Sequence, residues 1–239
     1  MQEGSFRPYQ QKGQLLATHA RTRSLKVLVI GAAVSALVLG GGATGASASE
    51  ADLSDDALTQ FRANLTASAD IAAFDALDAA QEAELADYLL GEIDPFADLS
   101  EAAPRDGDFE LRTVTASEST GGIAARATTR SVSAWQSFLF AGITISKTTV
   151  RETYNYSGAN ATSIAAYSCV VDANYDPYSQ ITVSKAGAYV SGGKATAECK
   201  VTVKRGVPTP WGPISWSTAS NVQYVTGNGA GTVTSHGWR

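Results

Sequence analysis

Few side chains in the second half of this sequence could carry out catalysis. The whole sequence has two histidines. His19 lies near the amino terminus, and His236 lies three residues from the carboxyl terminus. A serine triad needs an imidazole that is held by a carboxylate, and neither an acidic residue nor a nucleophile elbow lies near His236 in the sequence. We therefore expect His236 to belong to a flexible tail, and we predict no catalytic residue and no enzymatic activity.

Only four carboxylates occur in residues 119–239, namely Glu152, Asp172, Asp176 and Glu198. A glycosidase with two catalytic acids would have to use a pair of them. Their spacing does not exclude this, although Glu198 falls on the solvent side of its expected strand. A carboxylate-dependent secreted hydrolase is the second alternative to a protein without catalytic activity.

Asp172, Asn174 and Asp176 match the opening of a calcium-binding loop. Pro177, however, occupies the position of the required glycine, and Val183 stands where the bidentate glutamate should be. A turn capped by Asp and Asn side chains explains the same residues, so we predict neither a metal nor another cofactor.

Four aromatic residues near expected turns, Tyr175, Tyr178, Trp211 and Trp238, could stack on bases or sugars. Residues 119–239 hold ten basic and four acidic side chains, a formal charge of +6. Outside the cell, this charge favours an anionic envelope polymer or an extracellular protein as the partner, and not an intracellular nucleic acid.

An extracellular location is predicted by the first 48 residues, which have the order of a secretory signal peptide. Basic residues precede an apolar run over 27–40, and the small residues Ala46 and Ala48 come directly before Ser49, the expected first residue after cleavage. Cleavage would leave no stable membrane span. If the signal is not cleaved, the same run would anchor the chain at the cell surface.

The cysteine content agrees with export. Cys169 and Cys199 are the two cysteines of the chain, and an even number in an oxidising compartment predicts one disulfide bond. Closing a loop of about 31 residues would stabilise the fold by about 3.7 kcal/mol in the chain-entropy model.

Residues 49–93 are expected to form an acidic helical segment. Ser54 is a suitable N-cap, a further helix should start near Asp78, and Gly91 is suited to end it. Residues 49–118 hold 18 acidic and three basic side chains, a formal charge of −15. Because the apolar surface of these short helices is small, we expect the segment either to dock on residues 132–239 or to remain loosely ordered, and a role as a propeptide is the alternative considered below.

Residues 94–131 have many turn-forming residues and no clear period, and are interpreted as a linker. Arg126 and Arg130 lie in it as candidate processing points, because exposed linkers are where proteases cut.

Residues 132–239 alternate between apolar and polar side chains, which is typical of β-strands. The clearest alternation runs from Ala195 to Val203, and a change of parity near Lys147 predicts a bulge or a crossing between sheets. Turn signals divide the region into six to eight strands. The sequence therefore predicts an antiparallel β-sandwich or barrel with one disulfide, preceded by the short helical segment.

These patterns favour a secreted, non-catalytic β-domain that binds an extracellular or cell-envelope target. The alternative is a preproprotein of a toxin or antimicrobial type, in which the acidic segment masks the basic β-domain until cleavage.

Overall fold

The computed structural model describes residues 50–100, 105, 107–119, 129–207 and 214–239. The expected signal peptide with Ala46, Ala48 and Ser49 lies outside the described residues, as do Arg126 and Trp211. Within the described ranges, no helix combines the length and the apolar character that crossing a membrane requires.

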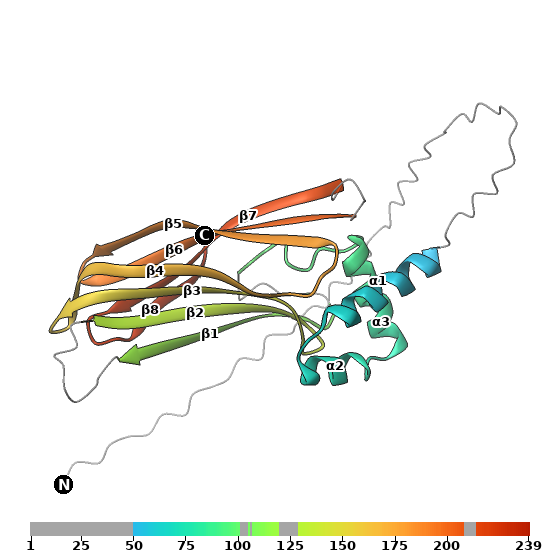
Figure 1. The fold of residues 1–239 in the computed structure, drawn as a ribbon, viewed down its shortest axis with the longest axis horizontal. Helices are drawn as coiled ribbons and strands as arrows, with labels where there is room; N and C mark the ends of the chain where they lie inside the picture. Colours follow the sequence, from blue (N-terminus) through green and yellow to red (C-terminus); the bar gives the residue numbers. More distant parts are fainter. Residues whose placement is uncertain (1–49, 101–104, 106, 120–128, 208–213) are drawn as a thin grey trace, which may run out of the picture. The chain divides into compact units, whose positions relative to one another are not determined.

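The protein is mainly β, as predicted, and consists of two four-stranded antiparallel sheets (Figure 1). Within each sheet, every strand pairs with the next strand in the sequence, so both sheets are simple meanders. The first sheet contains β1 (Phe109–Ser119), β2 (Thr129–Phe140), β3 (Ile143–Ser157) and β4 (Asn160–Asn174). The second contains β5 (Ser179–Ser191), β6 (Lys194–Val207), β7 (Ile214–Asn228) and β8 (Val233–Trp238).

The sheets face each other through the alternating apolar positions of their strands. In β6, Ala195, Ala197 and Cys199 are fully buried, whereas Lys194 and Lys200 are exposed. The register of β3 against β4 shifts at Lys147, which confirms the predicted bulge. The inward faces of both sheets together form a core that includes Val132, Val150, Tyr154, Ala195, Ala197, Cys199 and Val225.

The predicted disulfide between Cys169 and Cys199 is present and joins the two sheets. Cys169 belongs to β4 and Cys199 to β6, and their Cα atoms are 5.7 Å apart. The bond therefore crosslinks the sandwich through its interior.

Three short helices precede the strands, namely α1 (Glu50–Asn64), α2 (Ser68–Phe74) and α3 (Ala79–Leu90). Asp78 caps α3 in a capping box with Gln81, and Gly91 ends it in the left-handed conformation, so both predicted caps of this helix are confirmed. The first helix begins at Glu50, before the expected cap Ser54.

The helices pack against one end of the sandwich through a second core, which does not overlap the first (Figure 1). Phe61, Leu85 and Leu89 are fully buried in it and come from the helices, while Phe140 and Ile143 come from the strands. Apolar contact therefore covers an end of the strands that would otherwise expose aromatic and aliphatic side chains to water.

The structure differs from the sequence prediction in the expected linker 94–131. Residues 109–119 form β1, whose whole length pairs with β2, and Arg130 lies inside β2 and not in an exposed linker. The guanidinium of Arg130 lies over the ring of Tyr156, 4.4 Å from its centroid. The strand was missed because β1 is an edge strand rich in Thr, Ser and Glu, a composition that loops share.

Replacing both cysteines, Cys169→Ala with Cys199→Ala, will lower the free energy of unfolding by about 3 to 4 kcal/mol, because the unfolded chain loses its crosslink. Urea unfolding measures the change. Reductant should destabilise the wild type by a similar amount and leave the double variant unaffected. A double variant as stable as the oxidised wild type would contradict this account.

Candidate functional site

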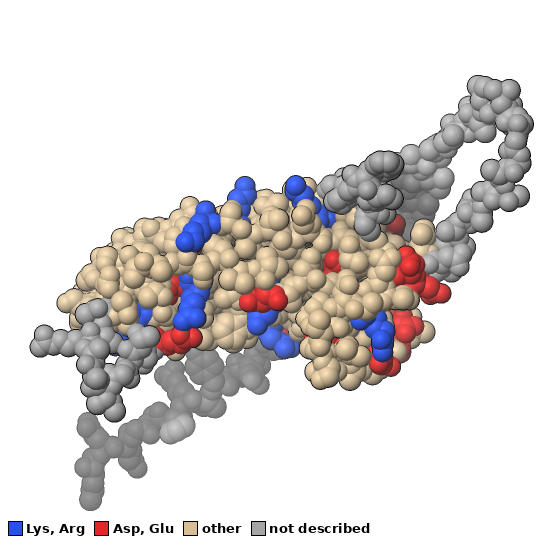
Figure 2. Space-filling model, in the orientation of Figure 1, with Lys and Arg blue, Asp and Glu red and all other residues tan. Residues whose placement is uncertain are grey.

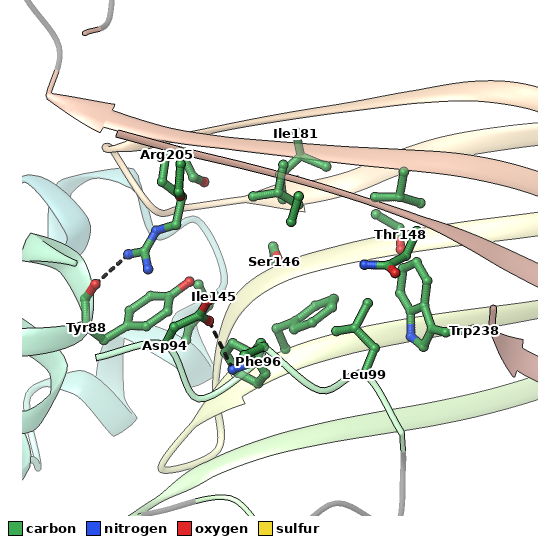
Figure 3. Close-up of a pocket in the computed structure, with 18 residues that line it drawn as sticks. Tyr88, Asp94, Phe96, Leu99, Ile145, Ser146, Thr148, Ile181, Arg205 and Trp238 are labelled. Atoms are coloured by element: carbon green, nitrogen blue, oxygen red, sulfur yellow. Dashed lines mark hydrogen bonds between the residues drawn. The ribbon is translucent and has the colours of Figure 1, made fainter. Parts of the chain in front are cut away.

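A cavity of about 120 Å³ lies between the two sheets, at the end of the sandwich that the helical segment covers (Figure 3). Both sheets and the segment that follows α3 contribute to its wall. The wall is formed by Tyr88, Asp94, Phe96, Ala97, Leu99, Phe138, Ile145, Ser146, Thr148, Ser179, Ile181, Val201, Val203, Arg205, Ser217, Ala219, Asn221 and Trp238. We refer to this cavity as the inter-sheet pocket.

Short side chains on β7 account for the space. Ser217 and Ala219 line the pocket from β7, and Ala219 pairs with the pocket-lining Val203 of β6. Aliphatic side chains at such inward positions would fill the gap between the sheets, as they do around Val225 in the fully packed part of the sandwich. The sequence of β7 therefore opens the pocket.

Residues 94–99 cover the pocket, and we call them the strap. The strap is fixed by a turn in which Asp94 Oδ1 accepts a hydrogen bond from Phe96 N at 3.2 Å, and by the ring of Phe96. That ring packs edge-on against Phe138, with centroids 4.8 Å apart. Arg105 holds the far end, because its Nη2 donates to Asp98 O at 3.0 Å.

A buried ion pair stands at one end of the pocket. Arg205 Nη2 lies 3.4 Å from Asp176 Oδ2 and donates to the carbonyl oxygen of Tyr88, and the guanidinium lies 4.1 Å from the centroid of the Tyr88 ring. Burial raises the pKa of Asp176, and Arg205 opposes that shift. Burial likewise raises the pKa of the Tyr88 hydroxyl. This pair links the second sheet to α3.

The sequence prediction did not include Arg205, although its position contains a signal. The inward alternation of β6 through Cys199, Val201 and Val203 continues to Arg205, so an arginine stands where an apolar side chain is expected. A charged residue on the inward face of a strand requires a partner, which here is Asp176.

Uncharged polar side chains lie at the other end of the pocket. Thr148 and Trp238 are in its wall, and Gln136 and Gln223 pair with them on the neighbouring strands; we call these four residues the polar cluster. Thr148 Oγ1 donates to Gln223 Oε1 at 3.0 Å, which joins the two sheets. Gln223 Nε2 donates to the carbonyl oxygens of Ala134 and Thr148, each at 3.3 Å. Thr148 and Trp238 line the pocket itself (Figure 3).

Of the aromatic residues predicted to stack on a ligand, Trp238 is in the pocket wall. Tyr175 and Tyr178 instead pack against the helical core. The hydroxyl of Tyr175 hydrogen-bonds Thr66 Oγ1 at 2.8 Å, and its carbonyl oxygen accepts from Asn64 Nδ2 at 3.1 Å. These two tyrosines therefore hold the helices on the sandwich, a role that sequence spacing did not indicate.

Of the residues that match the opening of a calcium-binding loop, Asp172 lies within β4, whereas Asn174 and Asp176 make the hydrogen bonds of the turn between β4 and β5. Asn174 exchanges hydrogen bonds with Ser179, through Nδ2 to the carbonyl oxygen and through Oδ1 from the hydroxyl, both at 2.9 Å. Asp176 Oδ1 accepts from Tyr178 N at 2.9 Å, and Asp172 accepts from Thr149. The described residues contain no group of three side chains placed to hold a metal ion.

The four carboxylates considered for hydrolysis lie in four different surroundings. Asp176 is paired with Arg205, and Asp172 is exposed beside Thr149. Glu198 faces outward from β6, where Arg239 Nη1 lies 3.0 Å from its Oε1. Glu152 is fully buried. The fold does not assemble them into one site.

His236 is not in a flexible tail, contrary to the sequence prediction. It lies in β8 and pairs with Val225 of β7. Because Val225 faces the interior, His236 is on the same inward face of the sheet.

Glu152 occupies the inward position between Val150 and Tyr154 of β3, and all three side chains are fully buried. Neither carboxyl oxygen has a hydrogen-bond partner among the described residues. Burial raises the pKa of Glu152 to about 8. The carboxyl is therefore protonated in the fold at neutral pH, because an unpaired buried charge would cost too much.

Comparison with protein-family models, with curated proteins and with solved structures finds no match to this chain.

Glu152→Gln will remove a pH dependence of stability. The pKa of Glu152 is about 8 in the fold against 4.5 for the free group, so its stabilising contribution is complete below about pH 4.5 and is lost as the pH rises toward 8. Thermal and urea unfolding should show equal stability of variant and wild type at pH 4, and a gain of about 3 kcal/mol for the variant at pH 7.

The outward-facing Glu198→Gln is the matched control, and should change stability by less than about 1 kcal/mol across the same range. If the stability curves of Glu152→Gln and the wild type run parallel from pH 4 to 8, the carboxyl does not titrate as the structure requires.

Proposed function

We propose that this protein is a secreted, non-catalytic binding domain that accommodates a small apolar group of an extracellular or cell-envelope molecule in its inter-sheet pocket. The pocket itself is the observation that carries the proposal. Ligand sites in proteins are concave, mainly apolar and equipped with a few polar groups, and they occur in the mouths of antiparallel β-structures. Ile145, Ile181, Val201 and Val203 supply the apolar wall.

The charged groups of the pocket support binding over catalysis. The titratable side chains of the wall are Tyr88, Asp94 and Arg205. Tyr88 and Arg205 contact each other, Arg205 is paired with Asp176, and Asp94 accepts the hydrogen bond of Phe96 N. A catalytic acid or base needs a free position next to the reacting atoms, whereas Tyr88 and Arg205 hold α3 against the second sheet and Asp94 fixes the turn of the strap.

The surface of the sandwich supports an anionic partner. Figure 2 shows acidic side chains concentrated over the helices and basic ones spread over the strands. Lys194, Lys200 and Lys204 share the outward face of β6, and Lys200 and Lys204 are exposed there. A negatively charged envelope polymer is attracted to such a face, and the attraction weakens as salt increases.

The preproprotein hypothesis has one structural feature in its favour, because the strap and helices cover the pocket. Two observations weigh against cleavage near Arg130. A cut there would separate β1 from β2, which pair from Phe109 to Ser119, and Arg130 itself lies within a strand. N-terminal sequencing of the secreted product separates the hypotheses: a start near Ser49 supports the binding domain, and a start near Ser131 supports a propeptide.

Ala219→Phe will block the pocket. Benzene fills apolar cavities of this size and, at ten times its dissociation constant, should raise the melting temperature of the wild type by about 4 °C. The variant should show no increase, because the new ring occupies the space that Ala219 leaves open.

Thr218→Phe is the control, because Thr218 pairs with Lys204 on the outward face while Ala219 lines the pocket. This variant should respond to benzene as the wild type does. An unchanged response of Ala219→Phe would place benzene elsewhere and remove the support for the pocket as a ligand site.

If the acidic segment is separated from the β-domain, the pieces should reassociate with an affinity that hardly depends on salt, because Phe61, Leu85 and Leu89 make the contact through apolar packing. Isothermal titration calorimetry at 50 and 500 mM NaCl measures this. A loss of affinity of more than about tenfold at high salt would show instead that charge attraction dominates.

A further inference from the structure

Among the described residues, the buried indole nitrogen of Trp238 has no hydrogen-bond acceptor. Trp238 lines the inter-sheet pocket, and its Nε1 is shielded from solvent and has no partner among the described residues. An indole N–H can only donate, and buried Trp and Tyr side chains generally find a partner. The unused donor therefore marks a position where an oxygen acceptor would be favoured.

An unused acceptor belongs to the same polar cluster. Gln136 is fully buried, and its Nε2 donates to Thr113 Oγ1 at 3.2 Å, but its Oε1 has no partner among the described residues. Gln136 pairs with Thr148 in the first sheet, and Trp238 pairs with Gln223 in the second. Because Thr148 bonds Gln223 across the interior, the four side chains form one group.

The remainder of the pocket is apolar in its middle and charged at the opposite end. Ile145, Ile181 and Val201 line the middle, and Arg205 is engaged with Asp176 at the end nearest α3. The polar cluster itself contains no charged side chain. A carboxylate or ammonium group placed there would lose its hydration without a counter-charge, whereas a neutral group would not.

We propose that the inter-sheet pocket is a site for a neutral amphipathic molecule whose hydroxyl oxygen accepts a hydrogen bond from Trp238 Nε1. The inference rests on the proposed binding function and adds the chemical class of the ligand. The apolar body of the molecule lies against Ile145, Ile181 and Val201, and the hydroxyl points to the polar cluster. A hydroxyl suits this position because its oxygen can accept from Trp238 Nε1, which has no partner within the described part of the chain, while its proton stays free to donate.

Phenol and benzene form a matched pair of probes, because they differ by a single hydroxyl and both suit a cavity of about 120 Å³. Titration of the full chain, followed by calorimetry, should give phenol an affinity about tenfold higher than that of benzene. In ¹⁵N-labelled protein, phenol should shift the indole N–H resonance of Trp238 downfield, and benzene should not.

Trp238→Phe removes the donor and keeps an aromatic ring. The variant should bind benzene about as well as the wild type, which shows that the pocket is intact, and should lose the preference for phenol. Trp135→Phe is the control, because Trp135 pairs with Val114 and Thr149 in the first sheet and is not in the pocket wall. It should retain the tenfold preference.

The outcomes distinguish this inference from the function on which it rests. Equal affinities of the wild type for phenol and benzene, with no selective shift of the Trp238 resonance, would overturn the hydroxyl subsite and leave the pocket as an apolar ligand site. If neither probe binds, the pocket is not a ligand site and both proposals fail. The resonance shift in the wild type decides the question even if Trp238→Phe does not fold.

Discussion

The inward faces of two meander sheets have to cover each other, and the rest of this structure depends on that constraint. Along most of the sandwich the faces meet through small or branched side chains such as Ala197, Val150 and Val225. Toward the helices the inward residues of β7 become short, and the sheets no longer fill the space between them. The apolar faces of the helices and the strap cover this end, so the helical segment contributes to the core of the domain.

The fold could be predicted where the polarity of a side chain indicates whether that side chain is buried. Alternation around Cys199, the cysteine pair, the bulge at Lys147 and the caps of α3 follow from local chemistry, and all are present. β1 could not be predicted, because an edge strand with one neighbour tolerates the same Thr and Ser residues that loops use. Its place in the sheet is decided by pairing with β2, which is a long-range contact.

The pocket was not predictable for a related reason. Its wall combines residues from six strands, the strap and α3, and no short stretch of sequence contains more than a few of them. The sequence did contain two signals of an unusual interior, because Arg205 and Glu152 occupy inward positions of their strands. The charge of Arg205 is neutralised by Asp176, and Glu152 is kept neutral by a proton. Both arrangements avoid an unpaired charge in the interior of the sheets.

The position of the disulfide has a mechanical consequence. Cys199 precedes the pocket residue Val201 by one inward position of β6, and Cys169 pairs with Val150, the inward neighbour of Thr148. The crosslink therefore fixes the spacing of the two sheets at the inner boundary of the pocket, so the sheets cannot move apart there. Any widening of the pocket has to occur on the side away from the disulfide, where the wall residues Ser217 and Ala219 are exposed, so molecules would enter and leave on that side.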